Sequence, residues 1–192
     1  MWSYNSKCYF ASGNRIMTEK PYSFIMNNIH ADIIAKARKI ELVVFDVDGI
    51  LTDGGIYMSK EGYESKRFFA QDGHGIVLLK SIGIEIGIIS GRSSECVNVR
   101  GKELGMKKIL QNSRDKLRDF EKVFLPEFDY QKTCFVGDDI VDRALLSKVG
   151  LSITVPNANY KVCEQPIDWI TPRAGGAGAA RDVCDLIYHS KL

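Results

Sequence analysis

Two aspartates one residue apart, Asp46 and Asp48, are the residues whose type and spacing most directly suggest chemistry. They follow the apolar run Leu42 to Phe45 and precede Gly49. Such a run bounded by a turn signal is typical of a buried parallel strand. Ligands bind at the carboxyl ends of strands in open α/β sheets. Because side chains alternate along a strand, we expect both carboxylates on one side, within reach of one metal ion or one substrate.

Three later strand ends also carry polar side chains. They matter because an Asp-x-Asp-Gly sequence alone is an ordinary turn. They are Ser90 after a predicted strand over 84–89, Lys116 beside one over 107–110, and Asp138 and Asp139 after one over 133–136, with Asp142 one turn later. Parallel strands gather their carboxyl ends at one edge, so we expect these groups at one rim. A lysine in a first helical turn opposes the helix dipole, so a separate benefit should keep Lys116 there.

Together these groups are the ones needed for phosphoryl transfer through an aspartyl phosphate. Asp46 is the expected nucleophile, and Asp48 the acid that protonates the leaving oxygen and later the base that activates water. A carboxylate that attacks a phosphate brings anion to anion, so positive charge must be in place beforehand. Lys116 supplies a fixed cation, and the Ser90 hydroxyl binds phosphate oxygen. Mg²⁺ held by Asp46 and Asp138 would supply the rest.

The elements that must position these groups alternate between strand and helix, which predicts an α/β fold with a parallel sheet. Helices are expected over 31–39, 76–81, 93–104, 112–124, 140–149 and 180–188, and strands over 41–46, 84–89, 107–110, 133–136, 151–155 and 168–170. A β-hairpin over about 55–70, with a turn at Lys60-Glu61-Gly62, follows the acidic loop. An isolated two-stranded hairpin is marginally stable in water, so we expect a partner surface for it.

Length and composition predict one domain over 29–192 after a weakly ordered leader over 1–28, in which Met17 and Met26 are alternative starts. A net charge of +2 gives no indication of nucleic acid or a membrane surface as a partner. No run approaches the roughly 20 apolar residues of a membrane span. The five cysteines form no CxxC pair, which indicates reduced thiols in a cytoplasmic protein.

Four motifs resemble, in order, those of the haloacid dehalogenase superfamily of phosphatases. They are DVDGILTDG, ISGR, Asp115-Lys116 and GDDIVD, and the likeness covers about residues 40–145. The resemblance implies a three-layer Rossmann-like sheet, with a small hairpin flap here in place of a cap domain. It also implies that Asp46, the Asp48 backbone carbonyl and Asp138 bind Mg²⁺, with Asp139 and Asp142 behind them.

Within the superfamily the chain is most similar to the family of 3-deoxy-D-manno-octulosonate 8-phosphate (KDO 8-phosphate) phosphatases. The similarity rests on DGILTDG, the hairpin, DGHGI, ISGRSS, Arg100, VPNA and RAGGAGAARDVCDLI, and runs from about Ile29 to the C-terminus. It implies hydrolysis of KDO 8-phosphate in lipopolysaccharide precursor synthesis and a homotetramer formed through the hairpins. The Gly-rich tail, 173–179, is either a mobile lid over its own or a neighbour's site or a flexible connector, and its density of glycine beside Arg173 favours a lid.

The same resemblance implies which residues bind the phosphorylated 3-deoxy-2-keto sugar acid. They are Asp48, Gln71, Asp72, Gly73, Arg92, Arg100 and Lys116. The forks of Arg92 and Arg100 suit a substrate carboxylate. Many members have arginines where this chain has Gln71 and Val77, so phosphatases of nine-carbon, sialic-type acid sugars are the nearest alternative.

Two alternatives belong to other classes of protein. A signalling receiver domain also uses a parallel sheet, a phosphorylated aspartate, a hydroxyl residue and a lysine, but it places paired acids one strand before that aspartate. Here the paired acids Asp46 and Asp48 come first. A non-catalytic copy of the phosphatase fold would be expected to lose catalytic acids, and this chain keeps them.

Overall fold

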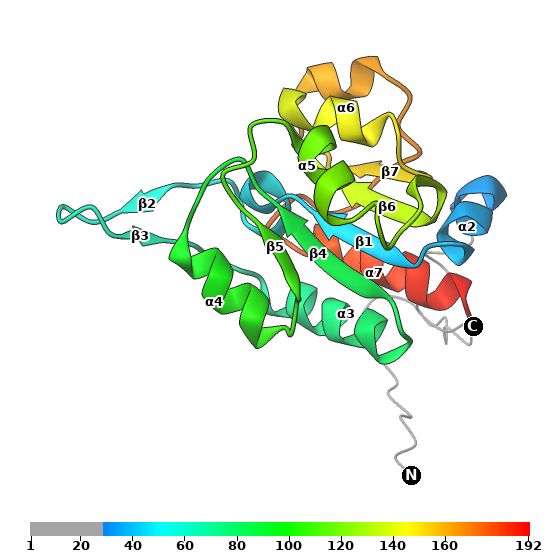
Figure 1. Cartoon of the computed structure of the whole chain (residues 1–192), viewed down its shortest axis with the longest axis horizontal. Helices are drawn as coiled ribbons and strands as arrows, with labels where there is room; N and C mark the ends of the chain where they lie inside the picture. The colour runs from blue at the N-terminus through cyan, green and yellow to red at the C-terminus, as the bar shows by residue number, and fades with distance from the viewer. Residues whose placement is uncertain (1–28) are drawn as a thin grey trace, which may run out of the picture.

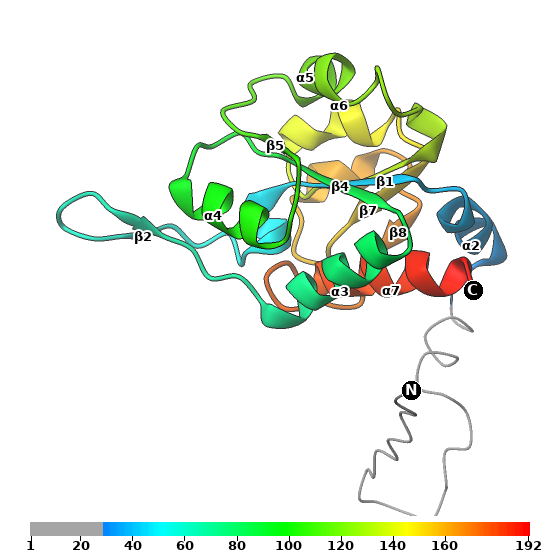
Figure 2. The ribbon, with the colours of Figure 1, turned by 60° about the horizontal axis from the view of Figure 1, so that its bottom comes forward.

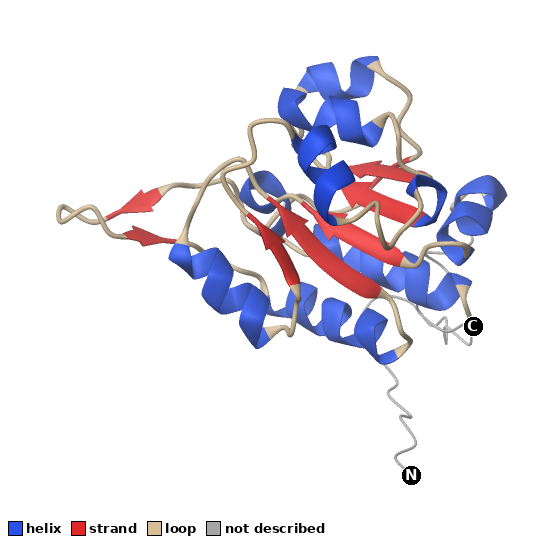
Figure 3. Ribbon diagram, viewed as in Figure 1, coloured by secondary structure: helices blue, strands red, loops and turns tan. Residues whose placement is uncertain are grey.

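The computed structural model describes residues 29–192, so the predicted leader over 1–28 lies outside the described residues. Residues 29–192 form a six-stranded sheet in the order β5-β4-β1-β6-β7-β8, with helices on both faces and a separate two-stranded ribbon, β2-β3 (Figures 1 and 3). Every pairing in the larger sheet is parallel. The predicted α/β class and parallel sheet are confirmed.

The strands are β1 (Leu42–Phe45), β2 (Tyr57–Met58), β3 (Glu64–Ser65), β4 (Glu85–Ile89), β5 (Lys108–Leu110), β6 (Thr133–Val136), β7 (Leu151–Thr154) and β8 (Trp169–Ile170). The helices are α2 (Ala31–Arg38), α3 (Ala70–Ser81), α4 (Glu95–Glu103), α5 (Lys116–Val123), α6 (Arg143–Leu146) and α7 (Ala179–Ser190). Shorter helical turns are η1 (Val47–Leu51), η2 (Tyr130–Lys132), η3 (Ile140–Asp142) and η4 (Tyr160–Glu164).

The direction of the strand order changes between β1 and β6. From β1 the chain builds outward through β4 to β5, then crosses back to β6 on the other side of β1 and continues through β7 to β8. Phe45, the last residue of β1, pairs with Ile88 on one side and Val136 on the other. In open α/β sheets such a reversal opens a crevice at the carboxyl ends of the two strands. Asp46 and Asp138 follow those two strand ends.

Two apolar clusters hold helices against the two faces of the sheet. One joins α2, α3, α4 and α7 to the sheet through side chains such as Ile76, Val97 and Leu186. The other joins α5 and α6 through side chains such as Phe120 and Leu145. Figure 2 shows α3 and α7 below the sheet, with α5 and α6 above it. The sheet is therefore buried on both faces, as its continuously apolar strands predict.

Helix α3 begins at Ala70, six residues before the predicted start, so that expectation was wrong. Its glycines suggested a loop, but they permit close packing instead. A Cβ at Gly75 would lie 2.9 Å from the Cys184 Cβ on α7, so a larger residue would push the two helices apart. The Asp72 carboxylate also accepts the Arg181 backbone N–H at 2.7 Å, which ties the two helix starts together.

Two other helices are shorter than predicted, and both start close to the site. The predicted helix over 112–124 begins only at Lys116, because Asn112 has a left-handed φ of 58° and the Asp115 side chain caps the helix by accepting the Arg118 N–H at 3.1 Å. The predicted helix over 140–149 divides into the turn η3 and the four-residue α6.

The hairpin projects away from the body of the molecule (Figure 1). Its paired segments are shorter than predicted, and its large apolar side chains are exposed, namely Ile56, Tyr57, Met58 and Tyr63. That exposure is in keeping with the expected partner surface, and the homotetramer stays a prediction. Within 29–192, no helix has the length and apolar character needed to cross a bilayer. The cysteines described there form no disulfide with one another.

The end of α5 packs closely on the sheet, where Phe124 lies against Gly87 of β4. A Cβ at Gly87 would lie 2.5 Å from the Phe124 ring, so we expect Gly87→Ala to destabilise the protein by about 1–3 kcal/mol through overpacking. Urea unfolding measures the loss. Because Phe124→Leu makes room for the methyl group, the double variant should lose less stability than the sum of the single losses. Additive losses would contradict this account of the packing.

Candidate active site

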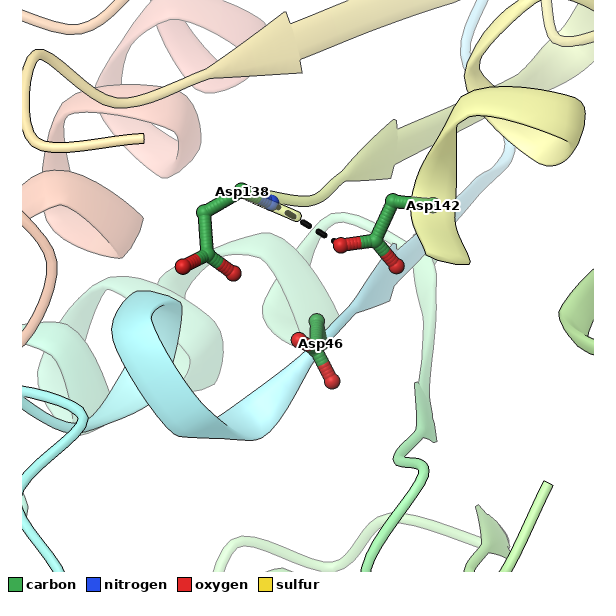
Figure 4. A group of neighbouring side chains, drawn as sticks. All are labelled: Asp46, Asp138 and Asp142. Carbon is green, nitrogen blue, oxygen red and sulfur yellow. Dashed lines mark hydrogen bonds between the residues drawn. The ribbon is translucent and has the colours of Figure 1, made fainter. Parts of the chain in front are cut away.

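Three carboxylates meet where the order of the strands changes direction. Asp46 follows β1, Asp138 follows β6, and Asp142 ends η3, and one oxygen atom from each lies within 4.8 Å of the others. Figure 4 shows the three side chains converging from these separate elements. The structure therefore brings together the two predicted metal ligands, Asp46 and Asp138, and adds Asp142 to them.

Lys116 lies against this acidic group with its side chain only 2% exposed. Its Nζ atom is 2.9 Å from Asp46 Oδ1 and 2.5 Å from Asp142 Oδ1. Burial alone would lower the pKa of Lys116, but the two carboxylates outweigh burial and the pKa is raised. The lysine therefore stays charged. These two contacts are the benefit that keeps a lysine in the first turn of α5 against the helix dipole.

Asp142 also orders the loop that carries Asp138. Its Oδ2 atom accepts the backbone N–H groups of Asp138 and Asp139, each at 3.0 Å. The exposed Asp139 accepts the Ile140 N–H at 2.8 Å and caps η3. Both acids therefore order the loop around Asp138, and their role behind a metal ion stays a prediction. Asp142 also presents an oxygen atom to the group of three.

The acidic group is poorly solvated, and this burial opposes ionisation of its carboxyl groups. Burial raises the pKa of Asp46 to about 7 against the opposing effect of Lys116, and burial together with Asp46 and Asp142 raises the pKa of Asp138 to about 8. Asp138 Oδ1 is buried without a hydrogen-bond partner. When ionised, the three acids exceed Lys116 by two negative charges. A hard divalent cation with oxygen ligands fits this set of donors.

Gly49 must be glycine for two reasons. Its φ of 94° lies in the left-handed region, and a Cβ atom there would overlap the Asp138 carboxylate. From the other side, a Cβ at Gly175 would overlap the Gly49 carbonyl oxygen, and Gly176 donates its N–H to Ile50 O at 3.0 Å. The Gly-rich segment is thus packed on the acidic loop of its own chain, and its opening as a lid stays a prediction.

Asp48 does not share the surroundings of Asp46. The paired strand ends at Phe45, and Asp48 has an extended backbone (φ −78°, ψ 112°) within the irregular turn η1. Its Oδ1 atom lies 2.5 Å from Lys66 Nζ, and its carboxylate is not a member of the group of three. The shared reach of Asp46 and Asp48 to one metal ion or substrate stays a prediction, as does a metal contact through the Asp48 carbonyl.

Ser90 and Arg92 lie at the end of β4. Ser90 is buried, and its hydroxyl oxygen accepts the Arg92 backbone N–H at 3.3 Å. The Arg92 side chain reaches Glu64 Oε1 at 3.0 Å and lies 3.8 Å from Asp48 Oδ2. Arg92, the predicted substrate arginine, therefore lies beside Asp48, the predicted acid, and forms an ion pair with Glu64.

The other predicted substrate residues form a separate group at the start of α3. Gln71 Oε1 accepts a hydrogen bond from Arg173 at 3.1 Å, and Asp72 is buried near Arg173 and Arg181. Arg100 on α4 lines a small cavity with Asp72 and Gly73 and pairs with Glu103 at 2.8 Å. Among the ion pairs and hydrogen bonds of residues 29–192, none joins these side chains to the acidic group.

Sequence reasoning missed Lys66, Glu64 and the close approach of Gly175. The two charged residues stand two positions apart at the end of the hairpin, so strand alternation could have placed them on one side, but nothing pointed that side toward Asp48. The contact of Gly175 with Gly49 joins segments far apart in sequence, and no local pattern encodes it.

Comparison with known proteins places this site in a family. No family model matches the sequence. The 3-deoxy-D-manno-octulosonate 8-phosphate phosphatase KdsC of Escherichia coli K12 is 40% identical over 163 residues, covering 83% of this chain and 85% of that protein. A phosphatase of the same name from Moraxella catarrhalis, solved with magnesium, phosphate and KDO, has a TM-score of 0.81 at 40% identity over 84% of this chain and 94% of its own.

A third relative extends the comparison to the superfamily. A structure described as a putative haloacid dehalogenase superfamily hydrolase from Legionella pneumophila has a TM-score of 0.79 at 35% identity, and covers 88% of this chain and 91% of its own. The fold and the site thus define a phosphatase of the haloacid dehalogenase superfamily. Within that superfamily, the chain belongs to the family of KDO 8-phosphate phosphatases.

The raised pKa values predict how stability depends on pH when no metal is bound. Between about pH 4 and 8 the folded state keeps protons on Asp46 and Asp138 that the unfolded chain has lost, so stability falls as pH rises. In EDTA, we expect the melting temperature to drop between pH 5.5 and 8.5. Asp138→Asn should flatten this dependence. A melting temperature that is constant or rises over this range in the wild type would contradict the assignment.

Proposed function

We propose that the protein hydrolyses KDO 8-phosphate to KDO and phosphate, with Mg²⁺ and through a phosphorylated Asp46. The observation that carries this proposal is the buried group of Asp46, Asp138 and Asp142 against Lys116, a cation-binding arrangement at a strand end. The Moraxella relative, solved with magnesium, phosphate and KDO, supports the choice of metal and substrate.

In the first half-reaction, an Asp46 carboxylate oxygen attacks the phosphorus atom and the bond from phosphorus to the sugar oxygen breaks. Lys116 Nζ, 2.9 Å from Asp46 Oδ1, orients the nucleophile and offsets the charge that gathers on the phosphoryl oxygens. Asp46 and Asp138 would hold Mg²⁺, with Asp142 beside them, and the ion when bound neutralises phosphate charge. The buried Ser90 hydroxyl binds a phosphoryl oxygen.

Asp48 handles the protons of both half-reactions. As an acid it protonates the departing sugar oxygen, and as a carboxylate it then takes a proton from the water that attacks the phosphorus atom of the Asp46 phosphate. The Asp46–phosphate bond breaks and the free nucleophile returns. The Asp48 side chain is partly exposed, so a leaving group and water can reach it.

Substrate selection falls to the residues around this centre. Arg92 would exchange its Glu64 partner for the substrate carboxylate, which a guanidinium binds bidentately. Gln71, Asp72, Gly73 and Arg100 would complete the sugar site, although within residues 29–192 they share no hydrogen bond or ion pair with the acidic group. The exposed hairpin would assemble the chain into a homotetramer, in which a neighbouring subunit would bring these residues to the site. Cytoplasmic location and a role in lipopolysaccharide precursor synthesis belong to the same proposal.

A substrate panel tests the proposed specificity. With Mg²⁺ present, we expect kcat/KM for KDO 8-phosphate to exceed that for hexose 6-phosphates by at least about 100-fold, a discrimination of about 2.7 kcal/mol. Arg92 is placed to bind the carboxylate that hexose phosphates lack. The nine-carbon acid sugar phosphates should also be poorer substrates. Equal or better turnover of a nine-carbon sugar would show that Gln71 and Val77 mark a different substrate.

A second experiment tests the covalent step. Asp46→Asn should lower phosphate release at least about a thousandfold while leaving the fold intact, because an amide oxygen is a far weaker nucleophile than a carboxylate. Acid-quenched wild-type enzyme should carry phosphate on the peptide that contains Asp46, detected by mass spectrometry. Asp32→Asn, an exposed substitution on α2, serves as the control. Full activity in Asp46→Asn would rule out the aspartyl-phosphate route.

A further inference from the structure

Lys66 is a buried cation beside the proposed acid, and the function described so far gives it no role. Its Nζ atom lies 2.5 Å from Asp48 Oδ1 and 3.1 Å from Glu64 Oε1, with its side chain 1% exposed. We propose that Lys66 is a positioning residue that fixes the Asp48 carboxyl group for proton transfer to the leaving sugar oxygen. This inference rests on the proposed function.

The charges around Lys66 explain why a buried lysine is stable there. An ammonium group removed from water must be paired and hydrogen-bonded. Lys66 has two carboxylate partners, and Arg92 bridges the same two acids from the more exposed side. Two acids and two bases leave this quartet, Asp48, Glu64, Lys66 and Arg92, without net charge. Glu64 thus supplies the counter-charge that lets Lys66 stay bound to Asp48.

The two oxygen atoms of Asp48 are not equivalent in this arrangement. Oδ1 is held by Lys66 Nζ at 2.5 Å. Oδ2 faces Arg92 Nε at 3.8 Å, which is beyond hydrogen-bond range. Lys66 therefore fixes one oxygen and leaves the other to carry the exchangeable proton. This is the orientation that a general acid requires, because its proton must point at the leaving atom.

The hairpin fixes Lys66 in turn. Lys66 directly follows β3, so its side chain and that of Glu64 point to the same side of the strand. The next residue, Arg67, donates to Gly176 O at 3.2 Å and lies 3.9 Å from Asp53 Oδ2. Neighbouring residues at the base of the hairpin therefore bind the acid and the Gly-rich segment. The hairpin delivers a cation to the catalytic loop in addition to any role in assembly.

The step that Lys66 supports is the breaking of the phosphorus–oxygen bond to the sugar. As that bond breaks, the electron pair goes to the sugar oxygen, the proton on Asp48 Oδ2 moves to the same oxygen, and a neutral alcohol leaves. Asp48 becomes a carboxylate, which Lys66 holds until it accepts a proton from the attacking water. An activated leaving group such as p-nitrophenolate departs without a proton, so its release does not depend on the orientation of Asp48.

This difference between leaving groups gives the test. With Mg²⁺ and enzyme in excess, single-turnover release of KDO from KDO 8-phosphate and of p-nitrophenolate from p-nitrophenyl phosphate is measured for the wild type and Lys66→Met. We expect KDO release to slow by about 10- to 100-fold. Release of p-nitrophenolate should slow by less than about threefold, because substrate binding and attack by Asp46 are retained.

Two matched variants accompany the measurement. Lys66→Arg keeps the cation and should restore KDO release to within about fivefold of the wild type. Lys148→Met removes a charge from an exposed lysine after α6 and should change neither rate. Circular dichroism and melting temperature check that each variant is folded, and Lys66→Gln replaces Lys66→Met should the latter not fold.

The outcomes separate this inference from the function on which it rests. An equal fall in both rates, or no fall in either, would overturn the positioning role of Lys66. A wild type that hydrolyses p-nitrophenyl phosphate but not KDO 8-phosphate would overturn the proposed substrate instead. The same comparison with an unactivated alkyl phosphate that the wild type does hydrolyse would then decide the role of Lys66.

Discussion

The buried ammonium group of Lys116 is the constraint on which the site depends. A charge removed from water is tolerated only when partners surround it, and Lys116 meets carboxylates of Asp46 and Asp142 that are themselves buried. The two carboxylates in turn depend on the charge of Lys116 to offset the cost of their own burial. One electrostatic arrangement thus fixes the start of α5, the end of β1 and the turn η3 relative to one another. When all three acids are ionised, their excess of negative charge over Lys116 suits a cation.

The fold brings these groups together through close backbone contacts as well as through charge. Gly49 lies against Asp138, and Gly175 lies against Gly49, so the acidic loop is enclosed between the strand end of β6 and the segment before α7. Asp142 accepts a hydrogen bond from the Asp138 backbone N–H and so orders that loop. A site built on strand ends and packed loops keeps its charged groups in place before substrate arrives, which is the basis of electrostatic catalysis.

Sequence reasoning was strongest where chemistry and local pattern coincide. The apolar runs predicted every strand of the sheet, and the strand-end acids Asp46 and Asp138 were predicted to meet, because parallel strands share one edge. It was weaker where tertiary packing overrides propensity, as in the glycines of α3, which look like a loop until α7 is placed beside them. It did not predict the contact of Asp48 with Lys66, because that contact depends on where the hairpin returns, and that path is set by contacts remote in sequence.

The contact of Gly175 with Gly49 has a consequence for the order in which the molecule is made. The acidic loop is synthesised early, but the segment that packs on it belongs to the connection before α7, the last helix of the chain. Until that segment has been synthesised, β1 and its neighbours are present and the loop lacks the Gly175 contact. Asp46 and Lys116 are therefore synthesised well before the segment that packs on the acidic loop, and the loop gains this contact only when that segment docks.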